Sequence, residues 1–436
     1  MFRTHRLAAV RAAAVLTAAG LVIGTAGCAS SDDDDVAADG TVTLSYFSWV
    51  PSPDQWKPII AQFEEENPKI KIDFKGANDS GQYLGELDNL ILADDTPDIY
   101  GIQATSAFDD YADYALDTEE YATDWIDGVK SELLDETTTS DGVVAAVPIL
   151  TAGSEFYLYN KTLFDELGLS LPTSYEELLA VSEAAEAAGY TGFAMGAADG
   201  WHDDDFFIWL ANQYGDGGEI YEAGAGDISW DSKPLVEAAT KWQELFTDGA
   251  FQEAATSTTL YPQARDDYLL ARKALAMPTG SWHVSATLSS NAETAGSAVE
   301  NDELGMAPMP TLGDNEAKST TGVDYALMLS ADLSGEKLDA AAKFAEFMAV
   351  GAGQQIWTNT MQGFPAATDV AIELGDGESE LALASVKLVT DSLQASEFPR
   401  KIRNTENDAL ETDLGVVLQN IANGADPATE LATLNQ

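Results

Sequence analysis

The stretch KIKIDFKGANDSGQYLGELDNLILADDTPDIYGIQ, residues 69–103, contains three successive patterns of apolar residues that together indicate the fold class. Apolar and polar residues alternate over 69–74, which predicts a half-buried strand. Residues 82–95 place leucines, an isoleucine and a tyrosine at helical spacing, and they predict a helix with one apolar side. Residues 96–103 are apolar after a proline and predict another strand. A strand, a helix and a strand in this order predict a parallel βαβ unit.

The same alternation begins earlier in the chain. Residues 41–50 are rich in β-branched and aromatic side chains and predict a strand. Residues 54–68 predict a helix, because Trp56, Ile59 and Phe63 recur at helical spacing before an Asn-Pro pair. We therefore expect an α/β fold, in which ligands bind beyond the carboxyl ends of the strands. The polar and aromatic positions that follow the three strands are Ser48, Trp49, 78–83 and 103–106.

The N-terminus has the pattern of an export signal. Three arginines precede an apolar Ala/Leu/Val-rich segment, which is typical of a secretory signal peptide and which we assign to residues 1–27. The sequence TAGC ending at Cys28 resembles a bacterial lipobox, although Thr25 stands where that motif prefers Leu, Val or Ile. We expect lipidation of Cys28, with ordinary cleavage nearby as the alternative. Residues 28–40 then form a disordered acidic tether.

Composition limits the function. The chain has 436 residues, 21 Lys and Arg against 74 Asp and Glu, and a formal net charge of −53. Such a charge repels nucleic acid. It favours a solubilising surface, and the alternative is that it attracts a cationic ligand. The single cysteine excludes a disulfide framework within the chain, and no other segment is long and apolar enough to span a membrane.

The middle of the chain predicts helices with clear ends. Residues 160–168 and 174–189 have helical patterns that both end at Gly. Either Thr173 or Ser174 opens the second helix, with Glu177 as its capping-box partner.

The densest group of polar and aromatic residues lies at 196–218. We expect Trp201, His202, Asp203 and Asp204 to lie in a loop introduced by Gly200. The aromatic residues that follow are expected to pack on the next helix; they are Phe206, Phe207 and Trp209.

Several segments in order resemble one family. They are ENPKIKIDF (66–74), TPDIYGI (96–102), the stretch from Tyr159 to Trp201, ARKALAMPTGSW (271–282), AAAKFAEFM (340–348) and NIANGADPATEL (420–431). The chain resembles the extracellular solute-binding proteins of bacterial ABC importers, in the sugar-binding group that includes maltose-binding protein. The resemblance implies a periplasmic-binding-protein-like fold, in which two α/β lobes close on a ligand in the cleft between them.

The resemblance also implies a division of the chain. Residues 41–149 and 310–347 are expected to form one lobe, and residues 150–309 and 348–436 the other. The crossings between lobes are expected at VPILTAG (147–153), MAPMPTLG (306–313) and FMAVGAG (347–353).

The resemblance singles out aromatic and planar polar side chains. Trp282 ends MPTGSW and corresponds to a tryptophan that stacks on the sugar; Trp201 and Asp203 lie in a segment that contacts ligand in the family. Trp49 follows the first strand, as family contacts do. Each has an alternative structural role, core packing for Trp282, a solvated turn for Asp203 and packing beside the hinge for Trp49.

Further candidates come from strand ends. Gln103 follows the third strand, where the chain departs from maltose-binding protein, so maltose itself is not implied. Asp324 lies in a glycine-bearing strand end that often faces the cleft, and Tyr325 beside it is a weaker candidate. The remaining candidate ligand contacts are His283, Tyr83 and Phe364.

Other function classes are less well supported. We expect no catalytic residues and no cofactor, because no Gly-x-Ser-x-Gly or His-Glu-x-x-His motif occurs; a two-carboxylate glycosidase is the enzymatic alternative. No two-His metal spacing occurs and we expect no metal site, with His202, His283 and nearby acids as the metal-binding alternative. A polyamine binder of the same fold is the second alternative, held by acids and aromatic faces. The expected partners are a carbohydrate and the subunits of an ABC permease, with the protein a monomer held outside the cell membrane by its lipid.

Overall fold

The computed structural model describes residues 37–51, 53–77, 80–289, 291, 293–403 and 407–435. The predicted signal peptide (1–27), Cys28 and most of the predicted tether lie outside the described residues.

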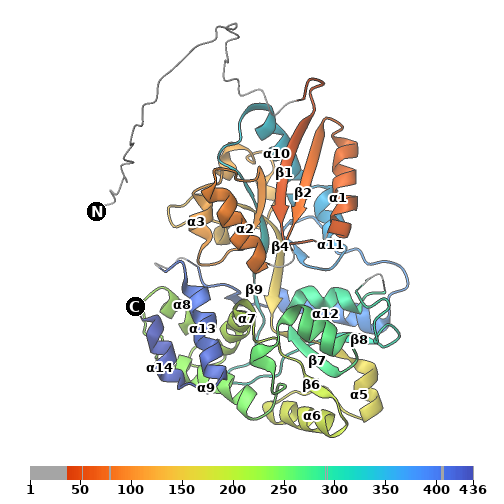
Figure 1. The fold of residues 1–436 in the computed structure, drawn as a ribbon, viewed down its shortest axis with the longest axis vertical. Helices are drawn as coiled ribbons and strands as arrows, with labels where there is room; N and C mark the ends of the chain where they lie inside the picture. The colour runs from red at the N-terminus through yellow and green to blue at the C-terminus, as the bar shows by residue number, and fades with distance from the viewer. Residues whose placement is uncertain are drawn as a thin grey trace, which may run out of the picture. The chain divides into compact units, whose positions relative to one another are not determined.

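The predicted βαβ units at the start of the folded chain are confirmed. Strand β1 pairs in parallel with β2 and with β3, over registers such as Tyr46 with Phe74 and Tyr46 with Ile99. The helices α1 and α2 are the connections between these strands (Figure 1). The bounds are β1 (Val42–Ser48), α1 (Pro53–Glu66), β2 (Ile70–Gly76), α2 (Ser80–Leu92) and β3 (Ile99–Ile102).

Two long strands extend this sheet on its other side. β4 (Val147–Ser154) and β9 (Thr320–Leu329) are antiparallel to each other, and β9 is antiparallel to β3. The strand order among the described residues is β10-β4-β9-β3-β1-β2, with β11 beside β9. The two short strands are β10 (Phe364–Pro365) and β11 (Phe398–Pro399).

The first lobe is this sheet together with the helices that cover it. Trp56, Ile59 and Phe63 occupy one side of α1 and are buried in its core, as their spacing predicts. The other helices whose buried residues join this core are α2, α3 (Phe108–Ala112), α4 (Ser131–Glu136), α10 (Gly335–Ala349) and α11 (Ala352–Thr358).

The second lobe is built on a smaller sheet with the order β6-β7-β5-β8. The central strand β5 alternates, since Tyr157 and Tyr159 enter one apolar cluster and Phe156 and Leu158 enter the other. The sheet is therefore covered on both faces. Its strands are β5 (Phe156–Asn160), β6 (Thr191–Phe193), β7 (Ala274–Thr279) and β8 (Leu304–Pro308).

Helices α7 and α13 lie side by side in the second lobe (Figure 1). Gly200 and Gly415 meet at their crossing, where a Cβ on Gly415 would come within 2.9 Å of the Gly200 Cα. The helices of this lobe are α5 (Lys161–Leu167), α6 (Tyr175–Ala187), α7 (Gly200–Ala211), α8 (Glu219–Gly224), α9 (Lys233–Thr247), α12 (Glu380–Gln394), α13 (Leu410–Ala422) and α14 (Pro427–Leu431). Shorter helical turns occupy Thr118–Glu120, Ile126–Gly128, Ala255–Ser257, Leu260–Leu269, Ser281–Thr287 and Ala432–Leu434.

The predicted cap of α6 is confirmed. The Glu177 backbone N–H donates to Ser174 Oγ at 3.3 Å, and the Thr173 N–H donates to Glu177 Oε2 at 2.8 Å. Both candidate residues take part: Ser174 caps the helix, and Thr173 donates a hydrogen bond to the Glu177 carboxylate.

The predicted loop around Trp201 is wrong, because residues 200–211 form the helix α7. The polar run His202–Asp205 concealed this helix in the sequence, because these polar side chains are buried together with the apolar residues that follow them. Phe206, Phe207 and Trp209 are buried on it, as predicted.

The chain passes between the two sheets near two of the three expected crossings. The first passage follows β4 at Ser154, and the second lies between β8 and β9. The third was expected at 347–353, but α11 still packs on α1 and α10, and the buried Ala366 also belongs to the first core. Phe364 already packs in an apolar cluster of the second lobe, so the chain contacts both lobes over 364–366 before α12, whose buried residues join that second-lobe cluster.

Within the described residues, no helix is both long and apolar enough to cross a membrane.

Candidate functional site

Arg400 joins the two lobes. Its Nε and Nη2 donate to Asp205 Oδ2 at 3.1 and 2.6 Å, and its Nη1 donates to Asp324 Oδ1. Asp205 lies on α7 of the second lobe and Asp324 on β9 of the first. One buried guanidinium therefore bonds to carboxylates of both lobes.

Two predicted residues, Trp282 and Asp324, contact this arginine, and each of them contacts one further predicted residue. The Trp282 ring lies under the Arg400 guanidinium, with its centroid 4.9 Å from Cζ. The rings of Trp282 and Trp201 lie 6.1 Å apart. On the first lobe, Gln103 Nε2 donates to Asp324 Oδ1 at 3.2 Å. We call Gln103, Trp201, Asp205, Trp282, Asp324 and Arg400 the Arg400 cluster.

Trp282 is held from behind by hydrogen bonds. Its indole N–H donates to the Tyr261 hydroxyl at 3.0 Å, and that hydroxyl also pairs with His283 Nε2 at 2.8 Å. His283 Nδ1 pairs in turn with the Thr279 hydroxyl. Burial lowers the pKa of His283 to about 3, so this ring is neutral and serves the hydrogen-bond chain. The predicted contact His283 thus lies behind Trp282, in a buried position.

Asp205 is the charged acid of its run. Burial alone would raise the pKa of Asp205, but Arg400 and Lys401 outweigh burial and hold it below its ordinary value. Lys401 Nζ lies 3.0 Å from Asp205 Oδ1, and both side chains are buried. Such an arrangement keeps Asp205 ionised inside the protein.

Asp203 does not reach the Arg400 cluster. Both of its carboxylate oxygens are buried without a hydrogen-bond partner, and burial raises the pKa of Asp203 and of Asp204 well above the ordinary value. On a helix, the residue four positions after Trp201 shares its side, whereas the residue two positions after it points away. The prediction of a loop favoured Asp203 as the acid beside Trp201. In the helix, Asp205 has that position.

The predicted residues near the first strand form a neighbouring group. The Trp49 ring lies 5.0 Å from the Tyr83 ring and 5.1 Å from the Tyr325 ring. Tyr83 is fully buried, and its hydroxyl donates to the Gly101 carbonyl at 2.6 Å. Tyr325 is also buried and bonds to the hydroxyls of Tyr46 and Ser48. Of these three aromatic residues only Trp49 is partly exposed.

Phe364 belongs to the apolar cluster against which Trp201 and Trp282 of the Arg400 cluster pack. It is buried in β10, opposite Thr151 of β4, and packs in an apolar cluster of the second lobe. No ring or polar contact joins its side chain to the Arg400 cluster among the contacts of the described residues.

Sequence reasoning missed the basic residues. Arg400, Lys401 and Arg403 are three cations in four positions, in a chain with 21 Lys and Arg in 436 residues. This local concentration of positive charge in an acidic chain is the sequence signal that could have pointed to Arg400. Arg403 attaches the same segment to the first lobe, because it donates to the Thr105 and Thr138 carbonyls at 2.8 and 3.1 Å.

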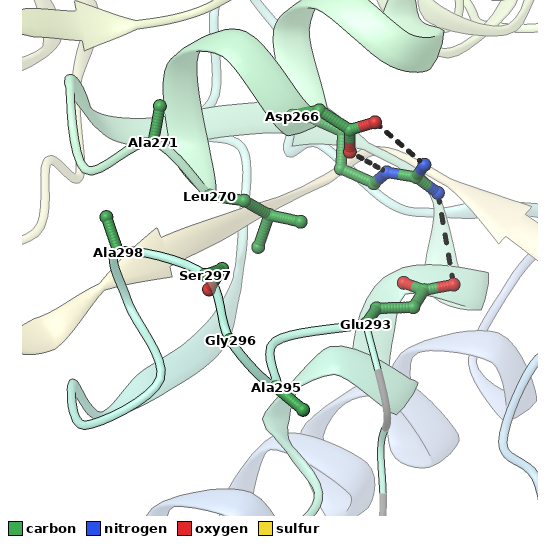
Figure 2. A pocket seen from close by; sticks show the side chains of 9 residues that line it. Asp266, Leu270, Ala271, Glu293, Ala295, Gly296, Ser297 and Ala298 are labelled. Carbon is green, nitrogen blue, oxygen red and sulfur yellow. Dashed lines mark hydrogen bonds and ion pairs between the residues drawn. The ribbon is translucent and has the colours of Figure 1, made fainter.

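A separate surface hollow lies on the second lobe. It has a volume of about 540 Å³ and is lined by Arg265, Asp266, Leu270, Ala271, Glu293 and 295–298. Figure 2 shows Asp266 and Glu293 on either side of the guanidinium to which both are joined. Its lining contains no aromatic ring, so it lacks the face on which a sugar stacks. The Arg400 cluster, which has two tryptophans, is the stronger candidate.

Metal binding has no support in the geometry. In the part of the chain that the structure describes, no group of three or more His, Cys, Asp and Glu side chains could hold a metal ion.

The sequence was compared with models of protein families and with known proteins. The model of the bacterial extracellular solute-binding protein family matches residues 49–355. The multiple sugar-binding protein of Streptococcus mutans is 26% identical over 341 residues, which cover 75% of each chain.

Solved structures share the fold. One comes from a study of xylan utilisation by the thermophilic bacterium Caldanaerobius polysaccharolyticus, with a TM-score of 0.76, 21% identity, and coverage of 91% of this chain and 99% of that one. Another is the GacH receptor of Streptomyces glaucescens, studied unliganded and with acarbose, with a TM-score of 0.70, 20% identity, and coverage of 90% and 96%. The expected periplasmic-binding-protein-like fold is confirmed.

Proposed function

Because this chain belongs to the family of bacterial extracellular solute-binding proteins, we propose that it captures a carbohydrate outside the cytoplasm and delivers it to an ABC permease. The carbohydrate is an oligosaccharide or a glycoside, bound where the two lobes meet at the Arg400 cluster. No step of chemistry on the ligand is part of this proposal.

The observation that carries this proposal is the combination of side chains around Trp282. Trp282 and Trp201 are both partly exposed and offer flat apolar faces to the C–H side of sugar rings. Asp324 and Gln103 lie on the opposite lobe and offer planar polar groups to sugar hydroxyls. An aromatic platform on one lobe and polar groups on the other suit a ligand enclosed by both.

The relatives support the same ligand class. The Streptococcus mutans relative is named a multiple sugar-binding protein, and the structural neighbours include receptors for raffinose and for chitin oligosaccharides. These proteins are named for different sugars, so they support a carbohydrate ligand but do not identify which carbohydrate binds here.

A cationic ligand is less well supported, because the acids near the tryptophans are already neutralised. Asp205 is paired with Arg400 and Lys401, and Asp324 is paired with Arg400. Burial raises the pKa of Asp203, Asp204 and Glu155 well above the ordinary value, so these groups favour the uncharged form.

A thermal-shift screen of neutral oligosaccharides, glycosides and polyamines tests the proposal. A ligand at one hundred times its Kd stabilises the folded state by roughly 2.7 kcal/mol, which is easily measured as a rise in Tm. Calorimetry of the best ligand at two salt concentrations then separates the classes, since polyamine binding weakens with salt and neutral-sugar binding hardly changes. If only polyamines raise Tm, the carbohydrate proposal fails.

We further propose that ligand closes the two lobes from a more open state, as a shift in a pre-existing equilibrium. Small-angle scattering with and without the ligand from the screen measures the change. An unchanged radius of gyration at saturating ligand contradicts this closure, without affecting the ligand class.

We also propose that Cys28 carries a lipid that holds the protein, as a monomer, on the outer face of the cell membrane. Mass spectrometry of the mature N-terminus identifies the modification, and Cys28→Ser is expected to release the protein into the medium. A mature protein that starts beyond Cys28 without lipid would overturn the anchor and leave the binding function standing.

A further inference from the structure

Arg400 controls the charge of the candidate site. Its side chain is buried, with 2% relative exposure, whereas the Asp324 side chain keeps 18%. Asp324 is thus the carboxylate of the Arg400 cluster that a ligand can reach. Its charge is balanced by Arg400, and its other hydrogen-bond partner among the described residues is the neutral amide of Gln103.

Arg400 also covers Trp282 with a positive charge. The guanidinium lies 4.9 Å from the ring centroid, close enough for a cation–π interaction. A cationic ligand that approached this ring would meet a charge of its own sign and would have to displace it. A neutral sugar meets no such repulsion and can use the remaining exposed ring surface.

The position of Arg400 is fixed by Asp205, which is itself held by a second cation. Asp205 holds the guanidinium through two of its nitrogens, and Lys401 holds Asp205 from the other side. Lys401 cannot replace Arg400 at Asp324, because its ammonium is engaged with the buried Asp205. Removal of the Arg400 charge therefore leaves Asp324 uncompensated while Asp205 keeps a partner.

We propose that Arg400 is a specificity-determining residue that restricts the site to uncharged carbohydrates, by neutralising Asp324 and covering Trp282. This inference rests on the proposed carbohydrate function. It adds the charge class of the ligand and names the residue that sets it.

The test is a gain of binding in Arg400→Gln, measured by calorimetry on the full mature chain. The cationic probes are spermidine and the fully deacetylated tetramer of glucosamine, and the neutral probes are raffinose and the N-acetylated tetramer. Arg400→Gln is expected to bind the cationic probes at least tenfold more tightly than the wild type, with no gain for the neutral probes. Arg400→Lys keeps the positive charge and is expected to show less than a threefold gain.

The double variant Arg400→Gln/Asp324→Asn is the matched control. It removes the exposed carboxylate as well, so the gain for cationic probes is expected to disappear. If Arg400→Gln shows no gain, or if the gain persists in the double variant, the inference is overturned. Absence of binding of every neutral oligosaccharide by the wild type would instead overturn the proposed function.

Asp324→Asn alone tests the inference even if Arg400→Gln fails to fold. Asp324 is partly exposed, and its replacement leaves Arg400 paired with Asp205. The site then gains positive charge, so affinity for the tetramer of galacturonic acid is expected to rise at least tenfold. Equal affinity of the wild type and Asp324→Asn for this anionic probe contradicts the inference.

Discussion

The Trp282 ring lies over Gly280 so closely that a Cβ atom on Gly280 would overlap ring atoms of Trp282. The Gly280 backbone is extended, so alanine is allowed there by its own conformation. Gly280→Ala should therefore act by displacing the ring, and we expect at least a tenfold loss of carbohydrate affinity. Calorimetry with the ligand from the screen measures it.

The control for this substitution is Gly85→Ala on α2, where a Cβ meets nothing within 4 Å. Alanine in the middle of a helix is favoured over glycine by roughly 0.5–1 kcal/mol, so this variant should gain stability and keep its affinity. Equal affinities of the two variants would mean that the position of the Trp282 ring does not matter for binding.

Two tryptophans should separate binding from stability. Trp357 is fully buried in the first core, 4.9 Å from the Tyr325 ring, and Trp357→Ala should cost about 3–5 kcal/mol of unfolding free energy. Trp282 is partly exposed, so Trp282→Ala should cost less stability but abolish measurable binding. Urea denaturation and calorimetry on both variants provide the comparison. Intact binding by Trp282→Ala would remove Trp282 from the site.

The buried pair of Asp205 and Arg400 should be costly to break. Asp205→Asn leaves the Arg400 and Lys401 charges without this carboxylate, which we expect to cost about 3–5 kcal/mol. Asp165→Asn removes an exposed partner of Lys161, and about 0.5 kcal/mol or less is expected there. Chemical denaturation gives both numbers, and similar losses would show that Asp205 is not essential to the buried charge balance.

Glu136 should make stability depend on pH. Burial raises the pKa of Glu136 to about 7, although the Val323 N–H, which donates to Oε2 at 2.8 Å, and the nearby arginines oppose the rise. Because the folded state holds this proton more tightly than the unfolded chain, its stabilising contribution is complete below about pH 4.5 and is lost as the pH rises through 7.

Glu136→Gln keeps an acceptor for Val323 and removes the titration. Relative to this variant, the wild type should lose up to about 3 kcal/mol of unfolding free energy between pH 4.5 and pH 8. Denaturation curves of the two proteins at intervals of one pH unit measure the difference. Parallel pH profiles would show that Glu136 keeps an ordinary pKa in the folded protein.

Local patterns in the sequence were sufficient for much of the first lobe. The alternation over 69–74 and the helical spacing of Trp56, Ile59 and Phe63 both describe one buried face, so the elements follow from local periodicity. The cap of α6 was equally local, since Thr173, Ser174 and Glu177 are neighbours in sequence.

The helix α7 shows where such patterns fail. The sequence of α7 does not show one apolar and one polar side, because Asp203, Asp204 and Asp205 are all buried although they are acidic. Burial of three consecutive acids depends on cations and helices that lie far away in the chain, and a polar run next to glycine is more often a loop. Because we predicted a loop, we selected Asp203 as the acidic residue of the site. Helical spacing places Asp205, four residues after Trp201, on the same side of α7 as Trp201.

Patterns in the sequence were enough to predict the α/β class, the resemblance to solute-binding proteins and the candidates Trp282, Trp201, Gln103 and Asp324. The way in which these residues are joined became visible only in the folded chain. Arg400 lies 195 residues from Asp205 and 76 residues from Asp324 along the chain, yet it bonds to both. Periodicity reports which side of an element is buried, but a salt bridge between elements depends on where the sheets place them, and that placement is set by the packing of the whole chain.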